Sequence, residues 1–282
     1  MKKDTRKLPS KRIWILIIIA LIPFFLFQNK HLVITNYTYE SDKLSPDLDG
    51  YRIVQISDLH NATFGKNNRK LLDAIKSCSP DMIVLTGDLV DSNHTNVKRA
   101  VSFVEQAVTI APVYYVTGNH EYWLTSTDRQ QTLQGILSAG AINLDNLSVS
   151  ITRGDSSFLL VGLDDHHLSD ETLKRLLTNQ NELSIVLAHE PQYLQEYADA
   201  GADLVLSGHA HGGQFRLPFI GGLVAPDQGF LPEYTSGDYT IADTDMIVSR
   251  GLGNSIIPVR LFNYPEIVCV ELKASSKQPT SP

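Results

Sequence analysis

The chain has 282 residues, of which 43% are hydrophobic and 20% are charged, and its formal net charge at pH 7 is −7. This length and composition allow one large globular domain, or two modest ones, with a sizeable hydrophobic core. The basic residues beyond the N-terminus are scattered along the sequence. The chain therefore lacks the basic stripe that would grip a nucleic-acid backbone, and no nucleic-acid partner is expected.

The N-terminus combines a basic stretch with an apolar one. Residues 1–12 contain six lysines and arginines against a single acidic residue, Asp4, and an unbroken apolar run from Ile13 to Phe27 follows. This run is between a signal-peptide core and a full membrane span in length. The six flanking basic residues and the continuous run of Ile, Leu and Phe argue against a helix buried in the core. We therefore assign residues 1–30 to a basic segment followed by a membrane anchor or signal.

The residues before Gln28 decide between the anchor and the signal. They offer no small-residue cleavage site, so a retained anchor is favoured over a cleaved signal peptide. The excess of positive charge before the apolar run would keep that end in the cytoplasm. We thus predict a cell-membrane protein with a single N-terminal span and with everything after Phe27 extracytoplasmic. If the segment is cleaved, the protein would be secreted or bound to the cell wall.

Short apolar runs and helical spacings alternate from Tyr51 onward. The apolar runs predict strands at Arg52–Ser57, Met82–Thr86, Val113–Thr117, Phe158–Leu163, Ser184–Ala188 and Leu204–Ser207. Helical spacing of apolar residues occurs at Leu71–Ile75, Val97–Val108, Leu133–Leu137 and Leu173–Leu177. After Gly208 short strands dominate, ending in Tyr239–Ala242, Met246–Ser249 and Glu266–Leu272. The pattern indicates an α/β first part followed by a largely β remainder.

The domain organisation is simple. No linker divides residues 45–273, so residues 31–273 are predicted to form a single domain, and the polar tail 274–282 is predicted to be disordered. The chain has only two cysteines, Cys78 and Cys269. A disulfide framework or a thiolate metal site is not expected from so few, and both are interpreted as small buried apolar residues.

Polar residues of one chemical kind follow five of the predicted strands. The loops carry Asp58-Leu59-His60, Gly87-Asp88, Gly118-Asn119-His120-Glu121, His189 and Gly208-His209-Ala210-His211. In an α/β sheet the strand ends and the loops that leave them form the functional edge. A lone Gly-Asp after a strand is usually a turn, but five such loops that bear only oxygen and nitrogen donors indicate a metal site.

The ordered series Asp-x-His, Gly-Asp-x-x-Asp, Gly-Asn-His-Glu, His and Gly-His-x-His resembles the calcineurin-like metallophosphoesterase superfamily. The resemblance spans residues 52–214. The later segments Gly212–Pro218 and Ser249–Gly253 resemble the subfamily of membrane-associated bacterial phosphodiesterases similar to the cell-wall enzyme of bacilli. The resemblance implies a four-layer αββα sandwich, two mixed β-sheets flanked by helices, with the metals at the carboxyl ends of the strands.

The resemblance also implies roles for individual residues. One metal ion would be held by Asp58, His60, Asp88 and His211, and a second by Asp88, Asn119, His189 and His209. His120 would be a catalytic acid that approaches the leaving group without binding metal. A carboxylate shared between two cations screens their repulsion, which suits Asp88. Carboxylate, imidazole and amide donors suit Mn, Fe, Zn or Co and do not choose among them.

Departures from two better-known branches narrow the function. Ser92-Asn93 follows Asp91 where phosphoprotein phosphatases place a phosphate-binding arginine, and Asp91 stands where purple acid phosphatases have a tyrosine. Both activities are therefore disfavoured. Asp91 and Glu121 are interpreted as residues that orient metal ligands. His166 and His167 are interpreted as part of a solvated loop at the rim of the site.

Together these features predict a dinuclear-metal phosphohydrolase or phosphodiesterase that uses metal-activated water at the membrane or cell envelope. The expected partners are a phosphate-ester substrate, a lipid or a cell-wall polymer among the candidates, and the membrane itself. Two alternatives stay open: a non-catalytic, membrane-tethered metal-binding module, and a lipid-precursor pyrophosphatase. The sequence leaves the preference for monoester or diester open as well.

Overall fold

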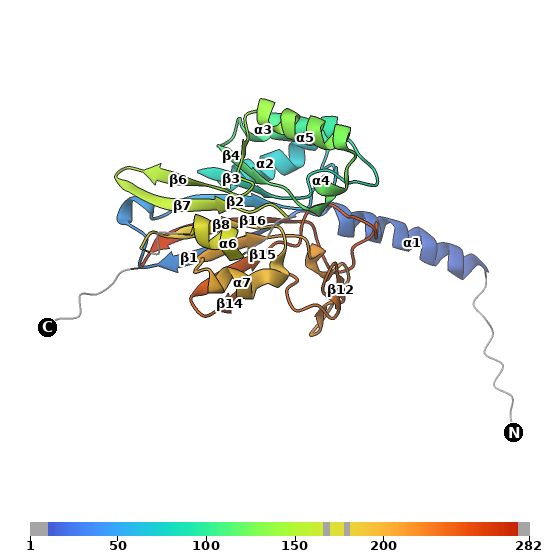
Figure 1. The fold of residues 1–282 in the computed structure, drawn as a ribbon. Helices are drawn as coiled ribbons and strands as arrows, with labels where there is room; N and C mark the ends of the chain where they lie inside the picture. The colour runs from blue at the N-terminus through green and yellow to red at the C-terminus, as the bar shows by residue number, and fades with distance from the viewer. Residues whose placement is uncertain (1–10, 166–169, 178–180, 276–282) are drawn as a thin grey trace, which may run out of the picture.

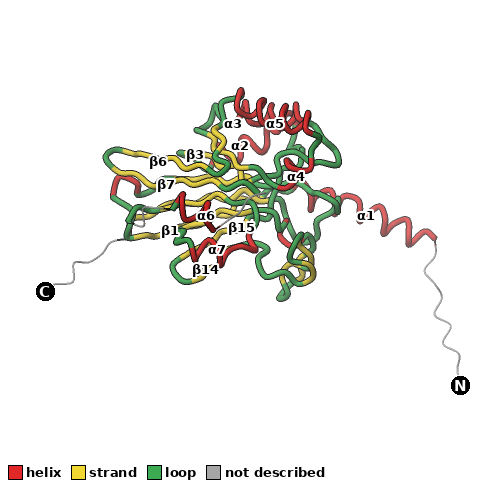
Figure 2. The backbone as a smooth tube through the Cα atoms, in the orientation of Figure 1, coloured by secondary structure: helices red, strands yellow, loops and turns green. Residues whose placement is uncertain are grey.

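Two six-stranded sheets pack face to face and carry helices on their outer faces, as the ribbon and the backbone tube both show (Figures 1 and 2). The computed structural model describes residues 11–165, 170–177 and 181–275. Helix, sheet, sheet and helix form four successive layers. The predicted αββα sandwich of two mixed sheets is confirmed.

The first sheet has the N-terminal strand at one edge. Its order is β1 (Val33–Ser41), β16 (Glu266–Ala274), β2 (Arg52–Ile56), β3 (Met82–Thr86), β4 (Val113–Val116) and β5 (Ile142–Asn143). Strands β2 to β5 are parallel, while β16 is antiparallel to β2 and parallel to β1. Every residue of β3 is buried, because the sheet is covered on both faces.

The second sheet has antiparallel strands at both edges. Its order is β14 (Gly237–Ile241), β15 (Thr244–Val248), β9 (Leu204–Ser207), β8 (Ser184–Leu187), β7 (Ser156–Gly162) and β6 (Leu147–Arg153). The four inner strands are parallel, whereas β14 and β6 run antiparallel to their neighbours. Both sheets therefore direct the carboxyl ends of several parallel strands toward one end of the molecule.

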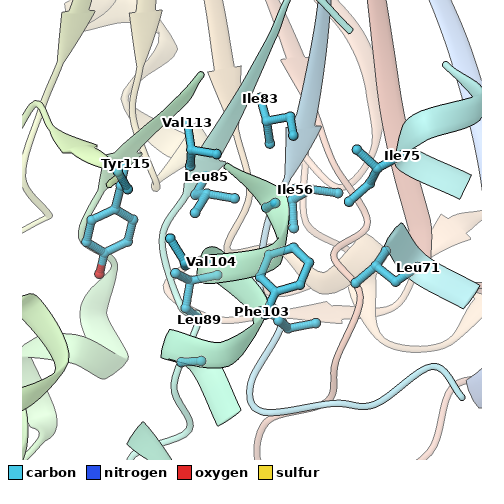
Figure 3. Packing of buried hydrophobic residues seen from close by; sticks show 14 of the residues in the cluster. Ile56, Leu71, Ile75, Ile83, Leu85, Leu89, Phe103, Val104, Val113 and Tyr115 are labelled. Carbon is cyan, nitrogen blue, oxygen red and sulfur yellow. The ribbon is translucent and has the colours of Figure 1, made fainter. Parts of the chain in front are cut away.

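Three apolar cores separate the four layers. The first core joins the outer face of the first sheet to α2 (Arg69–Ser77), α3 (Val97–Ala107) and α5 (Ser126–Ser138), and Phe103 and Val104 meet Ile56 and Leu85 there (Figure 3). The second lies between the sheets. The third joins the second sheet to α6 (Asp170–Leu176) and α7 (Leu194–Asp199). Full burial of one such large side chain contributes about 1.5–3 kcal/mol.

Short elements complete the fold. They are α4 (Asn119–Trp123), the 3-10 turns η1 (Pro46–Leu48), η2 (Lys66–Asn68), η3 (Pro191–Tyr193) and η4 (His211–Gly213), and the two-residue strands β10 (Arg216–Leu217), β11 (Gly221–Gly222), β12 (Val224–Ala225) and β13 (Gly229–Phe230). The four short strands form two small hairpins beyond β9.

The predicted strands, and the helices α2 and α3, occur within about two residues of their predicted bounds, whereas α5 begins seven residues before the predicted Leu133 and α6 three before Leu173. Strands β1, β5 and β6 and helices α4 and α7 were not predicted. Strand β16 continues through Ala274, and the Ser275 N–H donates to the Ser41 carbonyl, so the last sheet strand enters the segment predicted as a tail. The remaining tail, residues 276–282, and the basic residues 1–10 lie outside the described residues.

The two cysteines form a disulfide. Cys78 caps the end of α2, and Cys269 lies in the middle of β16. The two residues are 191 positions apart in sequence, but their Cα atoms are 6.7 Å apart and their sulfur atoms are bonded. The prediction that the cysteines would be unpaired apolar residues is wrong, because the packing of α2 on the first sheet brings them together.

Helix α1 (Lys11–Lys30) contains the apolar run noted in the sequence and projects from one end of the sandwich (Figure 1). Its last turns pack on the domain, since the Phe24 ring contacts Phe262 and the Phe27 ring contacts Tyr264. Within the described part of the chain, no helix reaches the length and hydropathy required of a membrane span. The predicted single span is therefore not confirmed.

Candidate metal centre

Five loops converge at the carboxyl ends of the parallel strands of both sheets. Asp58 and His60 follow β2, Asp88 follows β3, and Asn119 and His120 follow β4; His189 follows β8, and His209 and His211 follow β9. All eight side chains are buried. The structure thus brings together every residue that the sequence predicts for the site, at the edge where α/β proteins place their ligands.

The first group of potential ligands consists of Asp58, His60, Asp88 and His211. One ligand atom from each lies within 4.8 Å of the others. The Nε2 atom of His60 is 3.1 Å from Nε2 of His211 and 3.4 Å from Oδ2 of Asp88. Oδ1 of Asp58 is 3.5 Å from Nε2 of His211. These four side chains therefore direct their ligand atoms toward one common point.

The second group consists of Asp88, Asn119, His189 and His209. The Nε2 atom of His189 is 3.0 Å from Oδ1 of Asn119 and 3.3 Å from Oδ2 of Asp88. Nδ1 of His209 is 3.1 Å from the same Asn119 oxygen and 3.2 Å from Nε2 of His189. His209 therefore directs Nδ1, rather than Nε2, toward the group.

Asp88 belongs to both groups through a single atom. Its Oδ2 lies 3.4 Å from Nε2 of His60 on one side and 3.3 Å from Nε2 of His189 on the other. Its other oxygen, Oδ1, accepts a hydrogen bond of 2.8 Å from the backbone N–H of His120. The carboxylate is thus held by the backbone at Oδ1 and presents Oδ2 to the two groups.

The chemistry of these donors fits divalent metal ions. Among the described residues, the buried Nδ1 atoms of His60 and His211 have no hydrogen-bond partner, and their Nε2 atoms face each other across the first group. Burial lowers the pKa of His60 to about 3, which favours the neutral ring that a metal binds. Buried imidazoles and carboxylates gathered around one point are what a bound cation satisfies.

The carboxylate of Asp88 controls the charge of the second group. Burial alone would lower the pKa of His189, but the adjacent Asp88 carboxylate outweighs burial and raises it well above its usual range. Burial would likewise raise the pKa of Asp88, and the neighbouring His189 and His60 rings hold it well below its usual range. Asp88 is therefore ionised, as a ligand shared by two cations must be.

The backbone of these loops is strained at the potential ligands. Asp58, His60, Asp88, His209 and His211 all have positive φ angles, between 43° and 64°. Such angles are uncommon for residues other than glycine and cluster at functional sites. At Gly87, where φ is 87°, a Cβ atom would lie 2.5 Å from Nδ1 of His189. Only glycine allows β3 to turn that tightly beside the second group.

Glu121 supports the Asp88 loop, as predicted for an orienting residue. Its Oε2 accepts hydrogen bonds from the backbone N–H groups of Asp88 and Gly118, both at 2.9 Å, and its Oε1 accepts one from Val90 at 3.1 Å. Burial and the nearby charge of Asp88 raise the pKa of Glu121 to about 8, while the three backbone donors favour its ionised form. This buried carboxylate ties the ends of β3 and β4 together.

His120 lies beside the first group. Its Nδ1 accepts a hydrogen bond of 3.1 Å from the backbone N–H of Ser92, so the neutral ring carries its proton on Nε2. That Nε2 is 3.0 Å from the hydroxyl of Ser255. The ring packs against His60 and Trp123, and Oδ1 of Asp91 is 3.9 Å from Nδ1. His120 therefore presents a protonated nitrogen at the border of the metal centre.

Three residues at the site were missed by the sequence analysis. Oδ2 of Asp227 lies 2.9 Å from Nε2 of His209, and Ser255 contacts His120 as described. The buried Arg260 donates to the carbonyls of Arg250 and Gly253 and so shapes the loop that carries Ser255. None of the three lies in a strand-end motif, so no local signal marked them. His166 and His167 lie outside the described residues.

Two buried groups of potential ligands that share one carboxylate, at the carboxyl edges of two packed sheets, are the arrangement that a metal-dependent hydrolase needs. Residues 51–213 match the profile of the calcineurin-like phosphoesterases. The chain belongs to this family and is a metal-dependent phosphoesterase.

Several relatives share most of the chain. Metallophosphoesterase YkuE of Bacillus subtilis is 30% identical over 86% of this chain and 86% of its own. Phosphodiesterase YaeI of Escherichia coli is 29% identical over 79% and 82%. A transmembrane protein with metallophosphoesterase domain from Danio rerio is 30% identical over 82% of this chain and 55% of its own. The sulfate thiohydrolase SoxB of Thermus thermophilus shares the fold, with a TM-score of 0.51, 12% identity and coverage of 74% and 53%.

Proposed function

We propose that the two ligand groups hold two metal ions and that the enzyme hydrolyses a phosphate ester by in-line attack of water. Asp58, His60, Asp88 and His211 bind one ion, and Asp88, Asn119, His189 and His209 bind the other. The observation that carries this proposal is the single Asp88 oxygen that faces both groups at 3.4 and 3.3 Å. When bound, the two ions supply a water of lowered pKa and charge neutralisation for the phosphoryl oxygens.

The protein's own residues prepare the remaining steps. Asp88 offers one anionic oxygen to both sites and so reduces the repulsion between them. Glu121 holds the backbone N–H of Asp88, and the backbone N–H of His120 fixes the Asp88 carboxylate. In the imidazolium form, His120 donates its Nε2 proton to the departing oxygen and returns to the neutral ring, whose Nδ1 then accepts from the Ser92 N–H. The non-catalytic alternative is disfavoured because all seven ligand residues and His120 are present and buried.

The central test replaces the shared ligand. In Asp88→Asn the shared oxygen loses its charge, so both ions should bind more weakly and hydrolysis of bis(p-nitrophenyl) phosphate should fall by at least about 100-fold. Metal content by mass spectrometry and turnover in added Mn²⁺ measure this. Asp155→Asn, on the exposed turn between β6 and β7, is the matched control. Two bound ions and undiminished turnover in Asp88→Asn would refute the proposal.

We further propose that the enzyme acts on the outer face of the cell membrane. The basic residues before the apolar run, the exposed Ile22 and Leu26 side chains of α1 and a relative named as a transmembrane protein support this location. The disulfide between Cys78 and Cys269 supports it independently, because disulfides persist in oxidising compartments. At this location the enzyme would encounter phosphodiesters and phosphomonoesters of the cell envelope. Lipids and cell-wall polymers are the candidate substrates.

Cell fractionation tests this location. The full chain should sediment with membranes and resist extraction by salt, and protease added to intact spheroplasts should digest the domain. Removal of residues 1–30 should release it into the soluble fraction. A full-length protein that stays soluble, or one that protease reaches only after lysis, would contradict the proposed location without touching the metal chemistry.

A further inference from the structure

An apolar groove lies beside the metal centre, between α1 and the loop from Leu252 to Val259. Its volume is about 540 Å³, within the range of small-molecule sites. One wall consists of Leu21, Ile22, Phe25 and Leu26 of α1, and the opposite wall includes Pro258 and Val259. The polar residues Asn29, Lys30 and Asn254 gather at one part of its lining.

The groove adjoins the site through its floor. Leu252 and Gly253 line it, and their backbone N–H groups donate to the Asp58 carbonyl. Ala62, two residues beyond the potential ligand His60, also lines it. Two residues along the loop from Gly253, Ser255 contacts Nε2 of His120. The groove therefore lies against the loops that carry the potential ligands and His120's partner Ser255.

The walls of the groove are held in place. Nδ2 of Asn254 donates to Oδ1 of Asn29 at 2.6 Å and so joins the loop to α1. Nζ of Lys30 donates to the Thr63 carbonyl at 2.8 Å. The buried guanidinium of Arg260 contacts Asn254 and the Gly253 carbonyl. These contacts define a shaped surface with a lysine at its edge.

We propose that this groove holds the hydrocarbon chain of a lipid phosphate ester whose phosphate lies at the metal centre. The proposal rests on the proposed function and names its substrate class. The apolar walls match an alkyl chain, and Lys30 matches the anionic head group. The apolar surface also continues outward along α1, where Ile22 and Leu26 are 56% and 60% exposed. A wall polymer of glycerol or sugar phosphates offers nothing that such walls would recognise.

A substrate series with a constant leaving group tests the groove. The full chain in mild detergent is assayed with p-nitrophenyl phosphodiesters that carry methyl, butyl, octyl or dodecyl groups. Because p-nitrophenolate leaves in every case, only the alkyl chain changes. Full burial of one methylene corresponds to about fourfold in binding, so kcat/KM should rise by roughly two- to fourfold per methylene up to the groove's capacity. Equal kcat/KM for the methyl and octyl esters would overturn the proposal.

The variant Leu26→Asp places a charge in the groove, and Leu137→Asp places one on an exposed apolar site of α5. Leu26→Asp should flatten the chain-length dependence, while Leu137→Asp should keep it. Partition of the ester into detergent is the same for both proteins and cancels in the comparison. Turnover of the methyl ester should be unchanged in Leu137→Asp. If kcat/KM of Leu26→Asp still rose with chain length as in the parent, the proposal would be overturned.

The same measurements separate the two proposals. If no ester is hydrolysed although metal is supplied, the proposed function fails. If the methyl ester is hydrolysed but chain length has no effect, only the lipid-chain proposal fails. Competition adds a direct comparison: a short glycerol-phosphate oligomer should inhibit octyl-ester hydrolysis far less than a phospholipid of equal phosphate concentration. Stronger inhibition by the oligomer would favour a wall-polymer substrate instead.

Discussion

Oδ2 of Asp227 lies 2.9 Å from Nε2 of His209, on the far side of the ring from the Nδ1 atom that faces Asn119 and His189. The hydrogen bond from His209 lowers the pKa of Asp227, so the carboxylate is ionised. A carboxylate behind a ligand histidine fixes the tautomer and orientation of the ring and strengthens it as a donor.

The variant Asp227→Asn should therefore weaken the second metal site. We expect a loss of about 10- to 100-fold in affinity for one of the two ions, with the first ion retained. Calorimetric titration of Mn²⁺ into protein that a chelator has freed of metal resolves the two sites. Asp238→Asn, an exposed aspartate on β14, is the control and should titrate like the parent. A parent-like second site in Asp227→Asn would show that the carboxylate only caps the ring.

The variant His120→Ala should reduce kcat by about 100- to 10,000-fold while both metals stay bound, because the proton donor for the leaving oxygen is lost. The loss should be larger for an alkyl leaving group than for p-nitrophenolate, which needs less protonation. Steady-state kinetics with both esters and metal analysis measure this. His94→Ala removes a histidine side chain that is 89% exposed and serves as control. An equal loss for both leaving groups would argue against the acid role.

Removal of the disulfide should lower stability. Reduction, or the double variant Cys78→Ala with Cys269→Ala, frees a long loop in the unfolded chain and should cost about 2–5 kcal/mol of unfolding free energy. Thermal melts with and without reductant measure the loss, and the double variant should not respond to reductant. Protein exported from the cytoplasm should resist maleimide until it is reduced. Two freely labelled thiols in the unreduced protein would contradict the pairing.

Asp165 makes the stability of the metal-free protein pH-dependent. Burial, more than the nearby charge of Glu190, raises its pKa to about 7, although His189 acts in the opposite direction. Because the folded pKa lies above the unfolded one, the protonated side chain favours folding at low pH, and this contribution fades between about pH 4 and 7. Above pH 7 the folded protein must hold a buried carboxylate.

The variant Asp165→Asn should therefore stabilise the chelated protein at pH 8 by roughly 1 kcal/mol, or about 2–4 °C in melting temperature. At pH 4 the variant and the parent should melt together. Melting curves across this range test the direction, and Asp155→Asn, an exposed substitution, should show no such trend. A variant less stable than the parent at pH 8 would mean that the ionised carboxylate has a favourable partner in the folded protein.

The pattern of the sequence predicted an α/β fold and every residue of the converging loops, and the family resemblance implied the four-layer arrangement. Its signals were local. A strand buried on both faces, such as Met82–Thr86, must be continuously apolar, and a ligand that follows it stands out because a polar residue ends an apolar run. The shared edge of parallel strands then brings Asp58, Asp88 and Asn119 together without further information.

Only the tertiary structure revealed the partners of these residues. Asp227 lies in a turn, and Ser255 lies in a loop whose course depends on the buried Arg260. Cys78 and Cys269 meet across 191 residues because α2 lies on the first sheet. Turn and loop residues follow no periodic pattern, since neither burial on alternate faces nor a helical repeat constrains them. Their contacts arise when distant segments pack together. The potential ligands and Glu121 could therefore be predicted from the sequence, whereas Asp227, Ser255 and Arg260 could not.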